Sequence, residues 1–362
     1  MLGESIRSSG YFPGIYDPGP FNCITDVSGV KVGQLTLIEG DSVRTGVTAV
    51  LPHGENLFLD RVPAGVAVGN GFGKMVGVSQ IQELGELETP VLLTSTLAVP
   101  RAMEAIIEWT MAQPGLQTVQ SINAVVGETN DGYLNDSRRR PLTVEHMLAA
   151  IETAEAGQAV AEGAVGAGTG TVCFGWKGGI GTSSRRLPPE SGGTMLGVLV
   201  QANYGGYLQV LGVPVGRLLR QESSKQDDED GSIMILIATD APLSDRNLRR
   251  LAWRAFAGLA RTGSSLSNGS GDYALAFSTA HSVRRPMNGR REAGQIEHLP
   301  NDLMSPLFQA VIEATEEAIY NALFKATSMT GYLGRTIEAL PVARVLKIIE
   351  DSPWLAENHK RV

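Results

Sequence analysis

A serine stands where an acidic, polar stretch of the chain gives way to an apolar one. Residues 221–230 include six charged side chains, Gly231 follows, and Ser232 opens the apolar run 233–238. A cut between Gly231 and Ser232 would leave Ser232 with a free α-amine beside its hydroxyl, which places a base and a nucleophile on one residue. The alternative is an exposed loop that enters an ordinary strand, because Gly-Ser before a strand is common.

A second hydroxyl lies downstream, next to a carboxylate. The segment 267–273 reads SNGSGDY, which is typical of a turn that leads into a strand. Ser270 and Asp272 are two residues apart, so their side chains point to the same side of an extended segment. Such a pair could hold an amine by hydrogen bonds and tune its pKa. A polar turn that caps itself is the alternative.

Two more polar clusters follow predicted strands. Residues 127–136, GETNDGYLND, come after the apolar run 122–126, and polar groups at the end of a buried strand often furnish a site. Glu128 and Asp131 are candidates to bind a cationic amine, and Tyr133 is a candidate hydrogen-bond donor. Asn203 has a side-chain amide that could donate to a developing oxyanion. An ordinary loop with an Asn/Asp/Gly turn is the alternative for 127–136, and a hairpin turn before 207–213 is the alternative for Asn203.

Several common site patterns are missing from the sequence. The run GNGFGK at 69–74 has the spacing of neither a phosphate-binding loop nor a dinucleotide fingerprint, and no G-x-S-x-G elbow occurs. Cys23 and Cys173 lie far apart, and the five histidines form no cluster with them. The sequence therefore predicts neither a metal nor another cofactor.

Composition indicates a folded protein and argues against some partners. Hydrophobic residues make up 43% of the 362 residues and charged residues 19%, which supports a substantial core. The net charge of −8 and the lack of a basic stripe argue against nucleic acid. No apolar run reaches the ~18 residues of a membrane span. The N-terminus lacks a secretory signal. We therefore predict a cytoplasmic protein without a membrane partner.

Strands that look buried on both faces alternate irregularly with amphipathic helices. The expected strands are 30–37, 47–51, 65–68, 90–95, 122–126, 170–176, 194–201, 233–239 and 273–279. The expected helices are 100–112, 143–156, 245–261, 305–328 and 340–351, with Ser244 as an N-cap. Two sheets between outer helices would bury both kinds of element, and a doubly wound parallel sheet is the alternative.

The polar segments together resemble one family. They read GETNDGY at 127–133, NYG at 203–205, GSIMILIATDAP at 231–242 and NGSGD at 268–272. The same combination is found in the self-processing aminopeptidases, the family of L-aminopeptidase/D-Ala-esterase/amidases and β-peptidyl aminopeptidases. The likeness also includes 69–74, 88–95 and 166–170, so it spans nearly the whole chain.

The resemblance implies a fold, a maturation step and an assembly. It implies an α/β four-layer α/β/β/α sandwich similar to N-terminal-nucleophile hydrolases, formed as one domain by 1–362. The precursor would cut itself between Gly231 and Ser232 into 1–231 and 232–362. The two fragments would stay associated and form homo-oligomers, commonly tetramers of heterodimers. Substrates would be short peptides, amides or esters with a free amino terminus, including β-amino acids in some members.

The resemblance also implies roles for the candidate residues. Ser232 matches the nucleophile, and Ser270 and Asp272 match the residues that support it. Some members carry Glu at the position of Asp272, so the carboxylate here is one methylene shorter. Asn203 and Tyr133 match oxyanion-binding and substrate-positioning groups. Glu128 matches the ligand of the substrate's ammonium.

Two other functions are compatible with the same residues. A related self-cleaving group transfers an acetyl group to amines such as glutamate or ornithine, but those enzymes resemble this architecture with threonine as the nucleophile. An uncleaved, non-catalytic binding protein is the third hypothesis. An assay of acyl transfer beside amide hydrolysis separates the first two, and one band on a gel without activity would favour the last.

Overall fold

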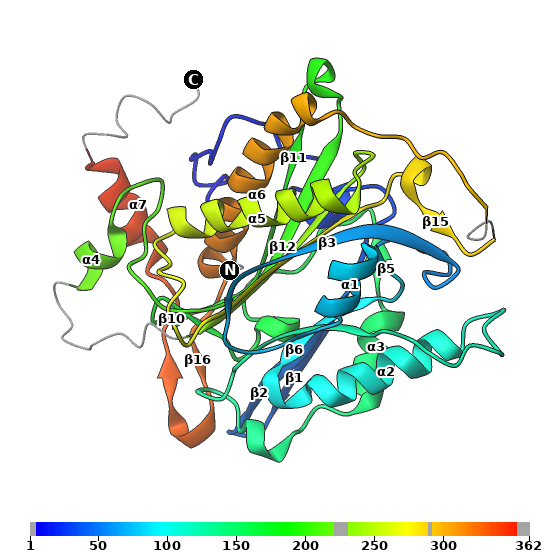
Figure 1. The fold of residues 1–362 in the computed structure, drawn as a ribbon. Helices are drawn as coiled ribbons and strands as arrows, with labels where there is room; N and C mark the ends of the chain where they lie inside the picture. Colours follow the sequence, from blue (N-terminus) through cyan, green and yellow to red (C-terminus); the bar gives the residue numbers. More distant parts are fainter. Residues whose placement is uncertain (1–4, 221–230, 289–291, 353–362) are drawn as a thin grey trace.

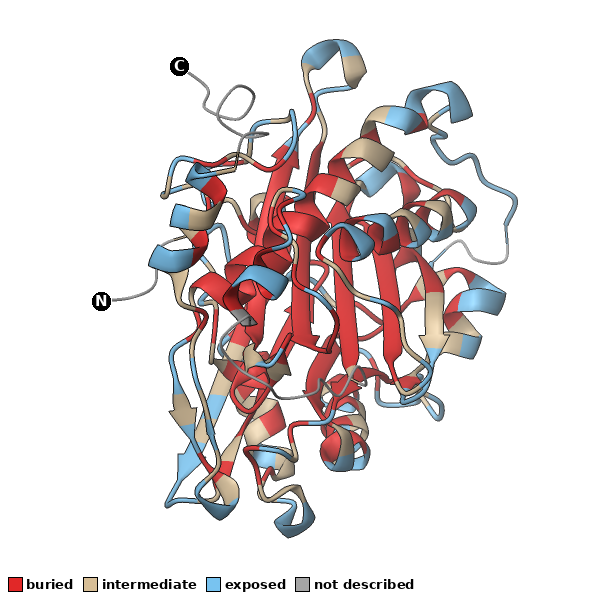
Figure 2. Ribbon diagram, turned by 90° about the vertical axis from the view of Figure 1, so that its left-hand side faces the viewer, coloured by how far each residue is buried: buried red, intermediate tan, exposed pale blue. Residues whose placement is uncertain are grey.

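The computed structural model describes residues 5–220, 231–288 and 292–352. The loop predicted at 221–230 lies outside the described residues. Figure 1 shows β-sheets between layers of helices, and Figure 2 shows that the central strands are buried along most of their length. The chain on both sides of residue 231 contributes strands to the same sheet.

The first sheet has the strand order β4-β7-β6-β2-β1-β8. Its strands β6 and β7 are parallel, whereas the other pairs are antiparallel. The strands are β1 (Lys31–Glu39), β2 (Val43–Leu51), β4 (Met75–Val76), β6 (Val91–Ser95), β7 (Val125–Thr129) and β8 (Glu155–Ala156).

The second sheet has the order β11-β12-β13-β14-β3-β15, with β5 paired to β3. Strands β13 and β14 are parallel, and β13 is antiparallel to β12. Its strands are β3 (Asp60–Gly71), β5 (Glu86–Leu87), β11 (Gly179–Arg186), β12 (Met195–Asn203), β13 (Ser232–Thr239), β14 (Gly271–Ser278) and β15 (Arg285–Pro286). All residues of β12, β13 and β14 are buried, as their apolar sequences require.

Helices cover the outer face of each sheet. Helices α2 (Val99–Met111) and α3 (Val144–Glu152) pack on the first sheet, and α5 (Asp245–Arg261) and α6 (Met304–Phe324) pack on the second. The Ser244 side chain accepts a hydrogen bond from the Asn247 N–H, which confirms the predicted N-cap of α5. Three shorter helices are α1 (Val78–Leu84), α4 (Val215–Arg220) and α7 (Val342–Glu350).

The apolar core has a layer between the sheets and one under each helical face. Alternating residues of β13 divide between two of these layers: Met234 and Leu236 face the first sheet, whereas Ile233 and Ile235 face α5 and α6. This alternation is the period of a strand that is buried on both faces. The α/β/β/α sandwich is therefore confirmed, and the doubly wound parallel sheet is excluded.

One predicted strand, 170–176, is instead a small hairpin. Strands β9 (Val172–Cys173) and β10 (Trp176–Lys177) pair across Phe174 and Gly175. Both turn residues have positive φ, 52° and 80°, which is the geometry of a two-residue hairpin turn. A second hairpin, β16 (Met329–Thr330) and β17 (Thr336–Ile337), follows α6. Among the described residues, every helix is too short or too polar to cross a membrane.

Candidate active site

A cavity of about 900 Å³ lies at the edge where the strands that carry the predicted residues meet. Asn203 ends β12, and Ser232 and Gly271 begin β13 and β14, so the three strand ends are neighbours in one sheet. Strand β7 of the other sheet brings Glu128 to the same place. The lining includes Ser232, Gly231, Glu128, Tyr133 and Asn203, which come from three segments far apart in the sequence.

Ser232 lies at the start of β13 with 8% of its surface exposed. Its register partner on β14 is Gly271, whose N–H donates to Ser232 Oγ over 3.2 Å and to the Gly231 carbonyl oxygen over 3.0 Å. A Cβ on Gly271 would lie 3.1 Å from Ser232 Oγ, so the serine side chain and this missing side chain share one face of the sheet. That face is the one turned toward the first sheet and Glu128.

Ser270 and Asp272 lie on the opposite face, on either side of Gly271. Ser270 Oγ donates to Asp272 Oδ1 over 2.7 Å, which confirms that the two side chains point the same way. Both are buried, and Asp272 Oδ2 has no hydrogen-bond partner among the described residues. Burial raises the pKa of Asp272 to about 6, and the hydrogen bond from Ser270 opposes this rise. The pair therefore flanks the backbone at Ser232 rather than its hydroxyl.

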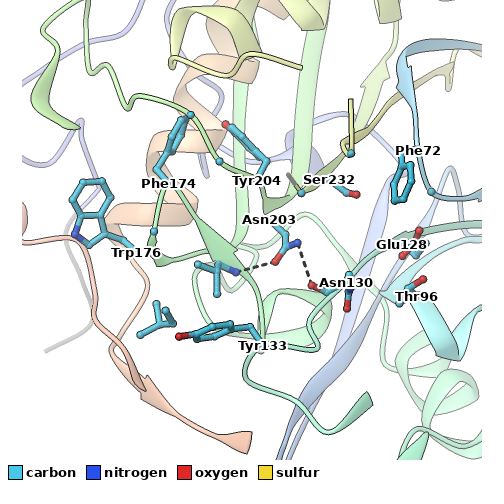
Figure 3. A pocket seen from close by; sticks show the side chains of 18 of the residues that line it. Phe72, Thr96, Glu128, Asn130, Tyr133, Phe174, Trp176, Asn203, Tyr204 and Ser232 are labelled. Carbon is cyan, nitrogen blue, oxygen red and sulfur yellow. Dashed lines mark hydrogen bonds between the residues drawn. The ribbon is translucent and has the colours of Figure 1, made fainter. Parts of the chain in front are cut away.

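The amide of Asn203 is fixed by two backbone groups (Figure 3). Its Oδ1 accepts the N–H of Val172 over 2.9 Å, and its Nδ2 donates to the carbonyl oxygen of Asn130 over 3.2 Å. These bonds decide which end of the amide is the donor. One N–H of Nδ2 remains for another acceptor at the cavity wall beside Ser232.

Glu128 is a buried carboxylate at the other side of Ser232. Its Oε1 accepts from the Lys74 N–H over 2.9 Å and lies 3.4 Å from Lys74 Nζ. A Cβ on Gly73 would lie 3.0 Å from Glu128 Oε1 and 3.9 Å from Ser232 Oγ, so the two functional oxygens flank one small space. Gly73 has φ of 119°, which favours glycine as well.

Asp131 does not line the cavity. Its Oδ1 accepts from Ser95 Oγ over 2.8 Å and from Asn135 Nδ2 over 3.0 Å, and burial raises the pKa of the Asp131 carboxyl. The side chain holds the loop after β7 against the end of β6. The structure thus separates the two predicted amine ligands and leaves Glu128 as the one at the cavity wall.

Tyr133 lines the cavity and is 48% exposed. The Arg335 guanidinium lies 4.9 Å from the centre of the Tyr133 ring. Figure 3 shows Tyr133 and Trp176 on one side of Asn203, with Phe72 and Glu128 on the other. The cavity therefore extends in both directions from Ser232.

Sequence reasoning did not select Phe72, Phe174 and Trp176, although these aromatic residues line the cavity. Phe72 stands in a glycine run, where an aromatic residue has no strand or helix to bury it, and it is 64% exposed. Phe174 packs edge-on against Tyr204 with 4.9 Å between ring centres. Phe-Gly at 174–175 is not a typical hairpin dipeptide, so the sequence carries no clear signal for this wall of the cavity.

Within residues 5–220, 231–288 and 292–352, no three His, Cys, Asp or Glu side chains gather in a way that could hold a metal ion.

Known proteins resemble this chain in sequence and in fold. The model of peptidase family S58 matches residues 22–337. A β-peptidyl aminopeptidase, BapA of Sphingosinicella microcystinivorans, is 41% identical, covering 94% of this chain and 90% of the relative. Among solved structures, a Burkholderia sp. β-aminopeptidase superposes with a TM-score of 0.90 at 40% identity, covering 97% and 99% of the two chains.

The L-aminopeptidase D-Ala-esterase/amidase of Ochrobactrum anthropi is a further structural relative. It is described as a prototype of the serine aminopeptidases and a variant of the Ntn (N-terminal nucleophile) hydrolase fold. It superposes with a TM-score of 0.88 at 36% identity, covering 96% of this chain and 98% of the relative. Taken with the family match over most of the sequence, these likenesses show that the chain belongs to peptidase family S58, the serine aminopeptidases with the N-terminal-nucleophile hydrolase fold.

Proposed function

We propose that this serine aminopeptidase activates itself by cutting the bond between Gly231 and Ser232, and that Ser232 is its nucleophile. The observation that carries the proposal is the placement of Gly231 and Ser232 together in the wall of the cavity that also holds Glu128 and Asn203. The bond to be cut and the groups for substrate turnover then share one site. One catalytic apparatus would serve both reactions.

Self-cleavage would begin with attack of Ser232 Oγ on the Gly231 carbonyl carbon. The Gly271 N–H already donates to that carbonyl oxygen and would stabilise the charge that develops on it. Collapse of the tetrahedral intermediate breaks the peptide bond, and the hydroxyl proton passes to the departing nitrogen. The resulting ester is hydrolysed by water, which leaves a carboxylate on Gly231 and a free α-amine on Ser232.

In turnover, the α-amine would take the proton of the Ser232 hydroxyl as it attacks the substrate carbonyl. A free α-amine has a pKa of ~7.7–8, close to the ideal for a base at neutral pH. Asp272 and Ser270 flank the backbone of Ser232, so their carboxylate and hydroxyl would hold the new amine. The Asn203 amide would donate to the oxyanion. The amine then protonates the leaving group, and water clears the acyl-enzyme.

Glu128 would bind the ammonium of the substrate's first residue. Its carboxylate and Ser232 Oγ flank the same space, which suits a ligand with an ammonium a few bonds from its reactive carbonyl. We propose short peptides, amides and esters with a free amino terminus as substrates. We include β-amino acids, because one similar protein is named a β-peptidyl aminopeptidase. The relatives named as aminopeptidases favour hydrolysis over acyl transfer.

We further propose that fragments 1–231 and 232–362 stay associated after the cut. Strands β12 and β13 lie on opposite sides of the cut and remain paired over eight residues of register. The homo-oligomer and the cytoplasmic location stay predictions from the sequence.

Mass spectrometry of active protein tests the maturation step. The expected result is two fragments, the smaller of which begins at Ser232, together with hydrolysis of an amino-acyl p-nitroanilide. Full activity in material whose residues 231 and 232 remain joined would overturn the proposal.

A further inference from the structure

Lys177 is fully buried, and its charge is satisfied by backbone alone. Its Nζ donates to the carbonyl oxygens of Gly168, Thr171 and Gly178 at 2.9, 2.8 and 2.7 Å. Three donors and three acceptors use the full capacity of an ammonium group. A buried lysine is costly without such partners. The three carbonyls enclose the segment 168–178, so the ammonium holds both ends of this segment together.

The segment held by Lys177 is the one that orients the Asn203 amide. Strand β9 starts at Val172, directly after the Thr171 carbonyl that Lys177 binds, and the Val172 N–H donates to Asn203 Oδ1. The register pairs Val172 with Lys177. The Phe174 N–H donates to the Tyr204 carbonyl oxygen over 2.7 Å, which ties the hairpin to the residue after Asn203. The carbonyl that binds the lysine and the N–H that fixes the amide thus belong to the same peptide group.

The charged form of Lys177 is required for this arrangement. Burial lowers the pKa of Lys177 to about 7, although the nearby Cys173 and Asp131 oppose this decrease. The three carbonyl acceptors favour the protonated form as well. A neutral amine has only two N–H donors and could not bind all three carbonyl oxygens at once.

We propose that Lys177 is a positioning residue, which holds hairpin β9–β10 so that the Val172 N–H fixes the Asn203 amide with its donor end toward the oxyanion. Lys177 is not among the residues that line the cavity, so its side chain is not placed to contact a substrate there. Lys177 therefore acts by orienting Asn203, and its loss should destabilise the transition state rather than the bound substrate. The inference rests on the proposed role of Asn203.

A double-mutant cycle between Lys177→Met and Asn203→Ala tests the inference. Asn203→Ala removes one oxyanion donor and is expected to lower kcat about 10²–10³-fold. Lys177→Met is expected to lower kcat about 10–100-fold with little change in KM, because a misplaced group costs turnover rather than binding. In the Asn203→Ala background, Lys177→Met should have little further effect. All rates are normalised to the fraction of cleaved protein.

Two more variants separate positioning from stability. Val172→Pro removes the N–H that binds Asn203 at the first residue of a strand, where proline is tolerated, and leaves Lys177 in place. It should reproduce the kcat loss and its dependence on Asn203. Lys325→Met removes a half-buried lysine paired with Glu162 and should keep wild-type kcat. This variant controls for the loss of a structural lysine.

The outcomes distinguish the two proposals. Wild-type kcat in Asn203→Ala would remove the proposed role of Asn203 itself. A large loss in Asn203→Ala with fully additive effects of Lys177→Met and Val172→Pro would overturn the positioning role alone. If Lys177→Met does not fold, additivity in the Val172→Pro cycle still refutes the link from hairpin to amide.

Discussion

Ser232 and Gly271 are register partners at the start of two parallel strands, and the Gly271 N–H reaches both Ser232 Oγ and the carbonyl before it. The donor thus lies between the proposed nucleophile and the carbonyl of the bond proposed to be cut. A Cβ on Gly271 would lie 2.3 Å from the Phe72 carbonyl oxygen, so only glycine allows this close approach. The backbone of β14 is therefore part of the proposed chemistry.

Ser232→Ala should give an intact chain without activity. Without Oγ nothing can attack the Gly231 carbonyl, so a denaturing gel is expected to show one band near 38.4 kDa. Ser278→Ala, at the other end of β14, is the matched control. Its hydroxyl donates to the Ala241 carbonyl oxygen, far from the cavity, so cleavage and turnover should persist. Two bands in the Ser232→Ala protein would exclude Ser232 as the nucleophile.

Glu128→Gln should lower kcat/KM for substrates with a free ammonium. The loss of a charge-assisted contact, about 1.5–3 kcal/mol, corresponds to a decrease in kcat/KM of about 10–150-fold. Asp131→Asn is the matched control, because this carboxyl binds Ser95 and Asn135 outside the cavity wall. Asp131→Asn should lower the melting temperature and leave KM nearly unchanged. A larger rise in KM for Asp131→Asn than for Glu128→Gln would indicate that Asp131, rather than Glu128, binds the substrate.

Asp272 should make the uncleaved precursor less stable as pH rises. Its pKa is raised from 3.8 to about 6, so the folded state binds the proton more tightly than the unfolded state does. Protonated Asp272 therefore contributes to the free energy of unfolding in full below its unfolded-state pKa. This contribution, up to about 3 kcal/mol, is lost as the pH rises from about 4 to about 6. Urea unfolding of Ser232→Ala and Ser232→Ala/Asp272→Asn across this range measures it.

The difference between the two unfolding curves isolates Asp272 in that experiment. The decline in stability should be steeper in the single variant than in the double variant, whose residue 272 does not titrate, because other buried carboxyls such as Asp131 and Asp240 titrate in both. Equal pH dependence in both proteins would contradict the raised pKa.

Arg185→Met should weaken the association of fragments 1–231 and 232–362. Arg185 on β11 pairs with Glu313 and Glu317 on α6 at 3.2 and 2.7 Å, and all three side chains are fully buried. Removing one partner of a buried pair costs ~3–5 kcal/mol, because the remaining charges are uncompensated. In cleaved protein we expect the fragments of the variant to dissociate at a lower urea concentration than those of the wild type. Analytical sedimentation measures this dissociation.

Lys347→Met provides the control for the ion-pair experiment. Its partner Asp351 lies on the same side of the cut, and both side chains are exposed. This variant should dissociate like the wild type. Equal behaviour of Arg185→Met and Lys347→Met would show that the buried pairs do not hold the fragments.

Local patterns predicted the layers and part of the site. Alternation placed Ser270 and Asp272 on one side, and the apolar runs of β12, β13 and β14 predicted buried strands, because both depend on neighbours in sequence. The roles of Glu128 and Asp131 could not be separated in this way. Glu128 lies in β7 and Asp131 follows three residues later, and the structure places one at the cavity wall and hydrogen-bonds the other to Ser95 at the end of β6.

Hairpin β9–β10 was missed for a related reason. An apolar run of this length reads as one strand unless the positive φ of Phe174 is known. Lys177, the next residue, was not selected, because nothing in the sequence indicates that three backbone carbonyls will surround its ammonium.

Gly231 is packed against the backbone of β12, since a Cβ there would lie 2.4 Å from the Asn203 carbonyl oxygen and the Tyr204 Cα. A bulkier residue would push the carbonyl to be attacked away from its donor. Anyone who fuses a foreign peptide ahead of the nucleophile, to build a self-releasing tag, must therefore keep glycine as its last residue.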